Sequence, residues 1–198
     1  MKNQFKIIRL SVIVLLLNAC ATTKPLKKEG ILMEEGADLF YKVKAGNSTY
    51  NFDININEFT NVISFDWEMG SNSGTVAMKE DAINNATDLK NYFSDGYKLL
   101  KTKTSVWFSK KLFTDLKSGK TVAIGLDNGI KENFEKTGIE TYSFGAKADK
   151  TPYNIPVLIL KSKETDKVIW VADDKNNPLI VKMNLDFSIH LVAYKAFK

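Results

Sequence analysis

The chain has 198 residues, of which 44% are hydrophobic and 26% charged, so its composition is that of an ordinary globular protein. One His, one Cys and one Arg are too few for a metal site with several His or Cys ligands, and they offer little for acid–base catalysis. Lys2, Lys6 and Arg9 contribute three of the five net positive charges, so the chain beyond residue 19 carries about +2 and contains no Arg. We therefore expect no nucleic-acid binding, enzymatic activity, cofactor or metal.

Residues 1–19 have the pattern of a secretory signal peptide. Three basic residues precede the apolar run 10–17. This run is shorter than the about 20 apolar residues that a membrane-spanning helix needs, and it has the length of a signal-peptide core. The sequence therefore predicts export.

The run Leu17-Asn18-Ala19-Cys20 resembles the lipobox of bacterial lipoproteins, in which the Cys becomes the N-terminal residue and carries the lipid. The resemblance implies a membrane partner through a lipid on Cys20; the alternative is an ordinary signal peptide before a buried Cys. Because Cys20 is the single Cys, an exported chain has no internal disulfide, which favours the lipid. Ala21, rather than Asp, follows Cys20, and by resemblance to enterobacterial sorting this favours the outer membrane, facing the periplasm.

Residues 20–36 are predicted to be the lipidated Cys and a flexible tether. They are mostly polar and lack apolar periodicity. The remaining residues, 37–198, show no repeat and no composition shift, so we predict a single β-rich domain there. The sequence predicts no oligomeric state.

Alternation of apolar and polar residues predicts strands in the first half of this domain. Residues 39–43 are the first predicted strand, and 50–57 and 63–69 follow with one apolar and one polar face each. The Gly-containing run 70–74 and the alternation that resumes after it predict a hairpin.

The middle of the chain changes period. Apolar residues at 108, 112 and 116 predict a helix over 105–118, with Ser105 as its N-cap and Gly119 just past its end. Residues 80–100 are predicted to contain turns and short helical pieces.

Strand patterns return after residue 120, at 121–126, 139–144, 155–160, 168–172, 179–183 and 187–194. The runs 155–160 and 168–172 are continuously apolar, which predicts strands covered on both faces. We also expect Trp67, in the earlier strand, and Trp170 to be core residues. The predicted fold is mainly β: an antiparallel curved sheet or incomplete β-barrel of about nine to eleven strands, with one or two short helices packed against it.

The order of these features resembles the bacterial DUF3108-type envelope proteins. The resemblance rests on the opening at 36–43, the helix before Lys117-Ser118-Gly119-Lys120-Thr121, and the stretch from Val168 through Asp174 to Leu179. It implies a fold like that of the LolA/LolB-type lipoprotein carriers, an incomplete barrel with helices against its open side. It implies no catalytic residues.

The single His and the acidic run near the C-terminus, which could suggest catalysis or metal binding, have structural explanations. His190 is predicted on the more polar face of its strand, together with Ser188, Val192 and Tyr194, and a lone His cannot build a multi-His metal site. The acidic run 173–178 ends in Pro and is read as a turn, since it lacks the ligand spacing of a calcium loop.

The aromatic residues carry the functional hypothesis. We expect a lipoprotein whose curved sheet binds a hydrophobic or amphipathic small molecule or lipid, because many aromatics lie on one face of amphipathic strands. The alternative is a structural or interaction lipoprotein with a filled core that binds envelope proteins or glycans; an envelope hydrolase is the third option. The predicted ligand-binding residues are Phe52, Ile54, Phe65, Trp67 and Tyr142.

Overall fold

The fold is taken from a computed structural model, which describes residues 30–127, 129–146 and 152–197. The predicted signal peptide, Cys20 and the first part of the tether lie outside these residues. Among the described residues, no helix combines the length and the apolar character needed to cross a membrane.

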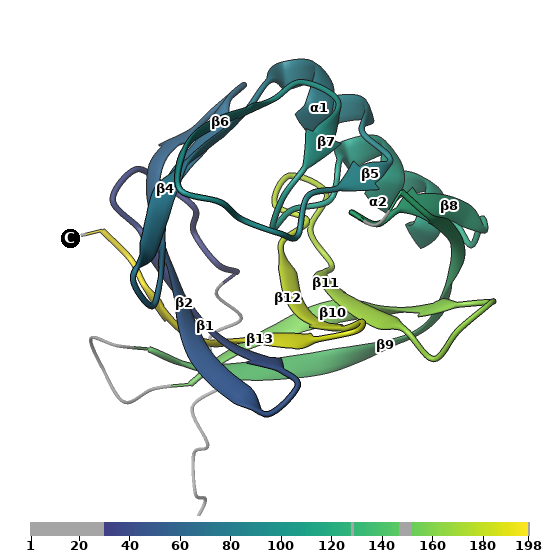
Figure 1. Cartoon of the computed structure of the whole chain (residues 1–198). Coiled ribbons are helices and arrows are strands. Elements are labelled where there is room, and N and C mark those ends of the chain that lie inside the picture. The colour runs from purple at the N-terminus through teal and green to yellow at the C-terminus, as the bar shows by residue number, and fades with distance from the viewer. Residues whose placement is uncertain (1–29, 128, 147–151, 198) are drawn as a thin grey trace, which may run out of the picture.

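One strongly curved sheet makes up most of the fold, as Figure 1 shows. Its thirteen strands follow the order β6-β4-β3-β2-β1-β13-β12-β11-β10-β9-β8-β5-β7, and a further pairing of β13 with β9 brings strands β9 to β13 into a partial ring. The strands are β1 (Asp38–Ala45), β2 (Ser48–Phe59), β3 (Ile63–Met69), β4 (Asn72–Met78), β5 (Asp88–Leu89), β6 (Gly96–Leu100), β7 (Lys103–Thr104), β8 (Val122–Gly125), β9 (Lys131–Ala146), β10 (Tyr153–Ser162), β11 (Val168–Ala172), β12 (Ile180–Asn184) and β13 (Ser188–Lys195).

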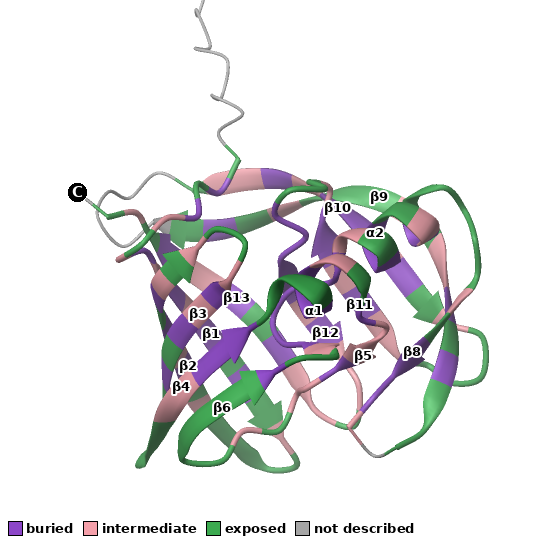
Figure 2. Cartoon of the chain, turned by 90° about the horizontal axis from the view of Figure 1, so that it is seen from above, coloured by how far each residue is buried: buried purple, intermediate pink, exposed green. Residues whose placement is uncertain are grey.

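Two short helices, α1 (Glu80–Asn85) and α2 (Lys110–Lys117), lie beside β5, β7 and β8 (Figures 1 and 2). The inner side of α2 is buried through Leu112, Phe113 and Leu116. In Figure 2, the buried residues follow the inner surface of the curved sheet beneath these helices. The prediction of a mainly β fold with a curved sheet and one or two helices is confirmed.

The apolar sides of the amphipathic strands in the first half of the domain form part of the inner face of the sheet. In β2 and β3 every second side chain is buried, and the register pairs Ile54 with Trp67 and Ile56 with Phe65. The predicted hairpin is present, but its turn is tighter than the run 70–74, because β4 already begins at Asn72. Gly70 has a φ of +66°, which residues with a side chain rarely adopt.

The strand number differs from the predicted nine to eleven because of the stretch between β4 and α2. This stretch holds β5 and β7, of two residues each, and β6. They pair in parallel, β6 with β4 and β5 with both β7 and β8. Such short strands join residues distant in sequence and leave no alternation to detect.

The predicted helix over 105–118 starts too early. Helix α2 begins after Ser109, whose hydroxyl accepts a hydrogen bond from a backbone N–H of the first turn at 3.0 Å. Ser105 instead donates its hydroxyl proton to a backbone carbonyl outside the helix, and the next residue, Val106, has a φ of +66°, which breaks any helix there. Gly119 follows the helix end with a φ of +88°, as predicted.

The packed part of the chain includes residues that the sequence placed in the tether. Ile31 and Met33 are buried. The Asn177 amide and the Tyr194 hydroxyl donate hydrogen bonds to the backbone carbonyls of Ile31 and Leu32. Two apolar side chains and two long-range hydrogen bonds are enough to fix this segment, but they are too few to produce a periodic pattern.

Tyr194 lies on the opposite face of β13 from the one predicted. The β1–β13 register pairs Phe40 with Ala193 and Tyr41 with Leu191, so Val192 is an extra residue in a β-bulge. The bulge reverses the alternation beyond it and turns Tyr194 into the core. His190, which precedes the bulge, is exposed as predicted.

Trp170 is not a core residue in the sense that was predicted. Its neighbours Ile169 and Val171 are fully buried, whereas Trp170 lies on the other face of β11 and is only partly buried. The Lys182 ammonium group lies 4.3 Å from the centre of its ring. One face of this apolar strand is therefore covered by a cation rather than by a second layer.

Candidate functional site

The described part of the chain offers no cluster of the side chains that usually bind a metal. It contains no group of three or more His, Cys, Asp or Glu side chains that could hold a metal ion. His190 lies between Lys42 and Lys182 of the adjacent strands. Partial desolvation of its ring, together with these two cations, lowers the pKa of its imidazole. An exposed His without a carboxylate at hydrogen-bond distance does not form a catalytic triad.

Glu132, the most buried carboxylate among the residues that the structure describes, belongs to a structural network. Its oxygens accept hydrogen bonds from Ser162, Thr165 and Lys167 at 2.6–2.8 Å. Desolvation opposes its ionisation, but the Lys167 ammonium and the two hydroxyl donors hold the pKa of Glu132 below its usual value. The carboxylate is fully satisfied, so its role is to fix the turn between β10 and β11.

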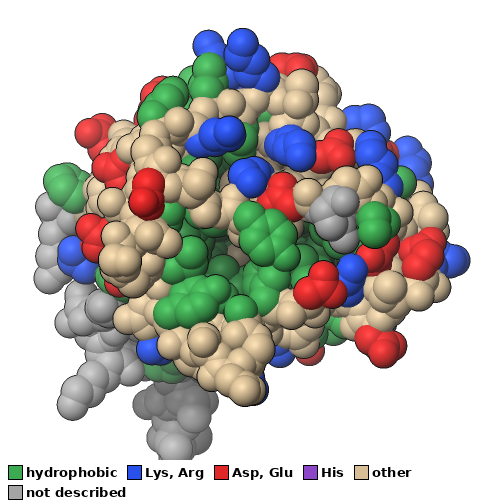
Figure 3. All heavy atoms as spheres, in the orientation of Figure 1, with side chains coloured by type: hydrophobic (Ala, Val, Ile, Leu, Met, Phe, Trp, Pro, Cys, Tyr) green, Lys and Arg blue, Asp and Glu red, His purple; other side chains and the backbone are tan. Residues whose placement is uncertain are grey.

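A surface groove lined mainly by apolar and aromatic side chains is the candidate site. Its volume is about 210 Å³. Figure 3 shows hydrophobic side chains on the floor of a hollow that faces the viewer, with Lys, Asp and Glu side chains around it. We call it the aromatic groove, and its lining residues are Val43, Ala45, Tyr50, Phe52, Met69, Asn91, Tyr92, Phe93, Asp186, Phe187 and Ile189.

Three parts of the fold form this groove. The ends of β1, β2 and β3 supply one wall, and β13 with the turn before it supplies another. The third wall is the link between β5 and β6, residues 90–95, which has no helix or strand structure. A smaller inner hollow of about 30 Å³ continues toward the core, lined by Tyr41, Phe52, Lys90, Asn91, Phe93, Ser105, Val106, Ile180, Met183, Phe187 and Ile189.

Phe93 connects the third wall with the core. Its ring centre lies 4.8 Å from that of Phe52 and 5.2 Å from that of Trp67, both tilted contacts. Its neighbour Tyr92 lies 6.0 Å from Phe187 across the groove and is 56% exposed. The groove therefore has a deep aromatic side at Phe93 and an exposed aromatic rim at Tyr92.

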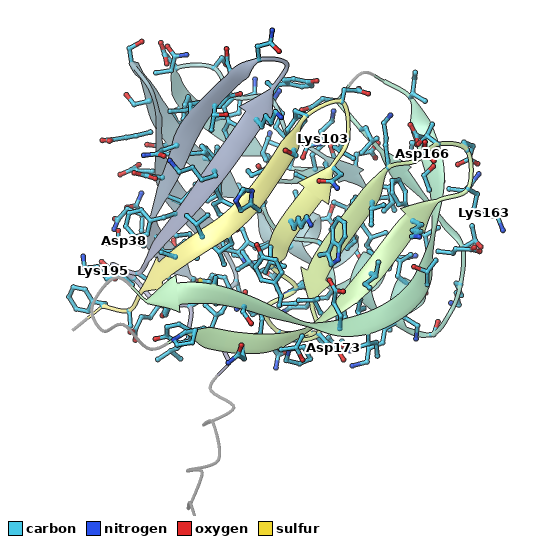
Figure 4. All side chains as sticks on the ribbon, turned by 90° about the horizontal axis from the view of Figure 1, so that it is seen from below. Asp38, Lys103, Lys163, Asp166, Asp173 and Lys195 are labelled. Carbon is cyan, nitrogen blue, oxygen red and sulfur yellow. The ribbon has the colours of Figure 1, made fainter. Side chains whose placement is uncertain are left out.

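Asp127 holds the 90–95 segment in place. The backbone N–H groups of Asn91 and Tyr92 both donate to one oxygen of its carboxylate, the second at 2.7 Å. The ammonium groups of Lys90 and Lys103 lie 3.7 and 3.9 Å from the same carboxylate. Figure 4 labels Lys103. It also labels Asp38 of β1 and Lys195 of β13, whose carboxylate and ammonium groups form a separate ion pair at 2.8 Å. Both oxygens of Asp127 thus face cations or N–H donors.

The residues predicted to bind a ligand do not gather at one cavity. Phe52 lines the aromatic groove. Ile54, Phe65 and Trp67 share its face of the sheet but are packed in the core, at most 2% exposed. Tyr142 lines neither the groove nor the inner hollow; its hydroxyl donates to the Leu191 carbonyl at 2.9 Å, and burial raises its pKa to about 12.

Sequence reasoning missed the groove residues that lie outside the long strands. Tyr92 and Phe93 fall in a stretch without periodicity, and Phe187 lies in a turn. The one available signal was an adjacent aromatic pair within a polar run, since such a pair must either find a hydrophobic partner or remain exposed.

A second hollow of about 240 Å³ lies where the described chain begins. Its lining residues are Gly30, Ile31, Asn154, Ile155, Pro156, Ala172, Asp173 and Asp174. No aromatic ring lines it, and its carboxylates have partners: Asp173 forms a 2.5 Å ion pair with Lys117, and Asp174 accepts the Asn176 N–H. We therefore take the aromatic groove as the candidate site.

The chain matches no protein-family model, no curated protein and no solved structure. The resemblance to DUF3108-type and LolA/LolB-type proteins thus stays a prediction from the sequence.

Proposed function

We propose that this protein is a non-catalytic binding module that holds an apolar part of a hydrophobic or amphipathic ligand in the aromatic groove. The observation that carries the proposal is an open groove of about 210 Å³ with aromatic and aliphatic walls and two polar side chains, Asn91 and Asp186. Ligand sites have this character, with apolar walls and few polar groups.

The volume of the groove limits what enters it. An engineered apolar cavity of roughly 150 Å³ accommodates benzene, and drug-sized ligands occupy about 300–1,000 Å³. At about 210 Å³, the groove accepts one ring or one short aliphatic chain. The ligand is therefore held by one apolar end, and the rest of it stays outside.

The proposed location is the bacterial outer membrane, facing the periplasm. This part of the proposal rests on residues 1–20, through the lipobox-like Leu17-Asn18-Ala19-Cys20. Cys20→Ser should abolish incorporation of radiolabelled fatty acid and release the protein from membranes, because the thiol is the lipid acceptor. If the Cys20→Ser protein still took up the label, the lipoprotein assignment would fail.

A structural or interaction lipoprotein is the second candidate, supported by the filled interior. Leu39, Ile56 and Phe65 are completely buried, and the inner hollow measures only about 30 Å³. On this view, envelope proteins or glycans meet the exterior, and the groove is a surface irregularity.

Binding of a fluorescent fatty acid to the purified domain separates the two candidates. Phe187→Asp places a charge in the groove and should weaken binding by about tenfold or more, which is about 1.4 kcal/mol. Ile139→Asp, at a side chain that is 57% exposed and outside the groove, is the matched control and should bind as the parent does. No saturable binding by the parent, or equal losses in both variants, would refute the groove and favour the structural candidate.

A further inference from the structure

The aromatic groove and the inner hollow meet at a common wall. Five residues line both of them: Phe52, Asn91, Phe93, Phe187 and Ile189. Beyond this wall, the inner hollow reaches toward Val106, Ile180 and Met183 in the core. The wall therefore determines how far an apolar group can enter from the outside.

The members of the wall differ in how firmly they are held. Phe52 and Ile189 belong to β2 and β13, both of which are hydrogen-bonded to β1. Phe93 belongs to the 90–95 segment, which has no helix or strand structure and is fixed by the hydrogen bonds of Asp127 at Asn91 and Tyr92. Its ring nevertheless reaches the inner face of the sheet, where it contacts both Phe52 and Trp67.

We infer that Phe93 sets the depth of the aromatic groove and thereby selects ligands by the length of their apolar group. This inference rests on the proposed function and specifies its ligand class: a molecule with one short linear chain or one ring. The Phe93 ring lines both the groove and the inner hollow, so a longer chain would have to displace it from its contacts with Phe52 and Trp67.

The contribution of each methylene gives the inference a measurable form. Burying one methylene group is worth about 0.8 kcal/mol, or about fourfold in affinity. In a series of linear fatty acids, affinity for the parent protein should rise by this factor with each added carbon and then level off. The chain length at which it levels off measures the depth of the groove.

Two opposite substitutions at Phe93 test the inference. Phe93→Ala joins the groove to the inner hollow, so the limiting chain length should increase by several carbons. Phe93→Trp enlarges the end wall, so the limit should decrease. Tyr97→Ala is the control, because this aromatic side chain is 66% exposed and lines neither hollow; it should leave the limit unchanged.

The experiment is a displacement titration with a fluorescent fatty acid against the linear series, with a thermal unfolding scan of each variant. Opposite shifts of the limiting length in the two Phe93 variants support the inference. An unchanged limit in the folded variants overturns it while leaving the proposed function intact. If the parent binds no member of the series, the proposed function itself fails. Should Phe93→Ala not fold, Phe93→Leu and Phe93→Trp give the same pair of opposite expectations.

Discussion

Truncating Trp67 tests how the core is built. The indole is 2% exposed, and it lies 5.2 Å from the ring of Phe93 and 6.3 Å from that of Phe52 in an aromatic cluster. Trp67→Ala removes a buried ring whose aromatic neighbours belong to two separate segments, β2 and the 90–95 link, so the cavity cannot close easily. The expected loss is about 3–5 kcal/mol of unfolding free energy, a large share of the about 5–15 kcal/mol of a typical domain.

Trp170→Ala provides the internal comparison. This ring is partly buried on the outer face of β11 and contacts the Lys182 ammonium at 4.3 Å. Its partial burial and a cation–π contribution of roughly 0.5–1 kcal/mol together give an expected loss of about 1–3 kcal/mol. Urea denaturation followed by circular dichroism measures both variants, and equal m-values would show that the same surface unfolds in each. Equal losses, or a larger loss for Trp170→Ala, would refute the assignment of Trp67 to the core and Trp170 to the outer face.

Three further predictions concern charged groups. Asp127→Ala leaves the backbone N–H groups of Asn91 and Tyr92 without their acceptor, so the free energy of unfolding should fall by about 1–3 kcal/mol. Amide hydrogen exchange at these two residues should accelerate, and unchanged exchange would contradict the anchoring role of Asp127. The folded-state pKa of Glu132 lies below its unfolded value, so its contribution to the free energy of unfolding is complete above the unfolded pKa and is lost as the pH falls through the folded pKa. Glu132→Gln should therefore make stability depend less on pH at acid pH, and an unchanged acid limb of the stability curve would contradict this role. Because the chain has a single His, its imidazole can be titrated by NMR without overlap. The pKa of His190 should lie below its ordinary value of 6.5, and it should rise in Lys182→Met; no rise would exclude an effect of Lys182.

The regular strands could be predicted from the sequence because their burial is amphipathic. β2 and β3 face the core with every second side chain, and the alternation of residues 50–57 and 63–69 reflects this directly. The later strands were also located, since β10 and β11 carry apolar runs between turn-forming residues. Period and composition are local properties, so they were sufficient for these elements.

The candidate site could be predicted only in part, because two of its walls depend on contacts between distant residues. Phe52 was identified from its strand, but Phe93 reaches it through a link whose position depends on Asp127, more than thirty residues later in the chain. The bulge at Val192 likewise depends on pairing between β1 and β13, at opposite ends of the domain. Neither local propensity nor periodicity contains this information.

Intermolecular nuclear Overhauser effects can show whether the aromatic groove binds an apolar group. In a complex of the labelled domain with a saturating short-chain fatty acid, the chain protons should show contacts to the rings of Phe52, Phe93 and Phe187. Ile155 and Pro156 of the second hollow should show none. Contacts confined to the second hollow, or no contacts at saturation, would show that the aromatic groove does not bind the apolar chain.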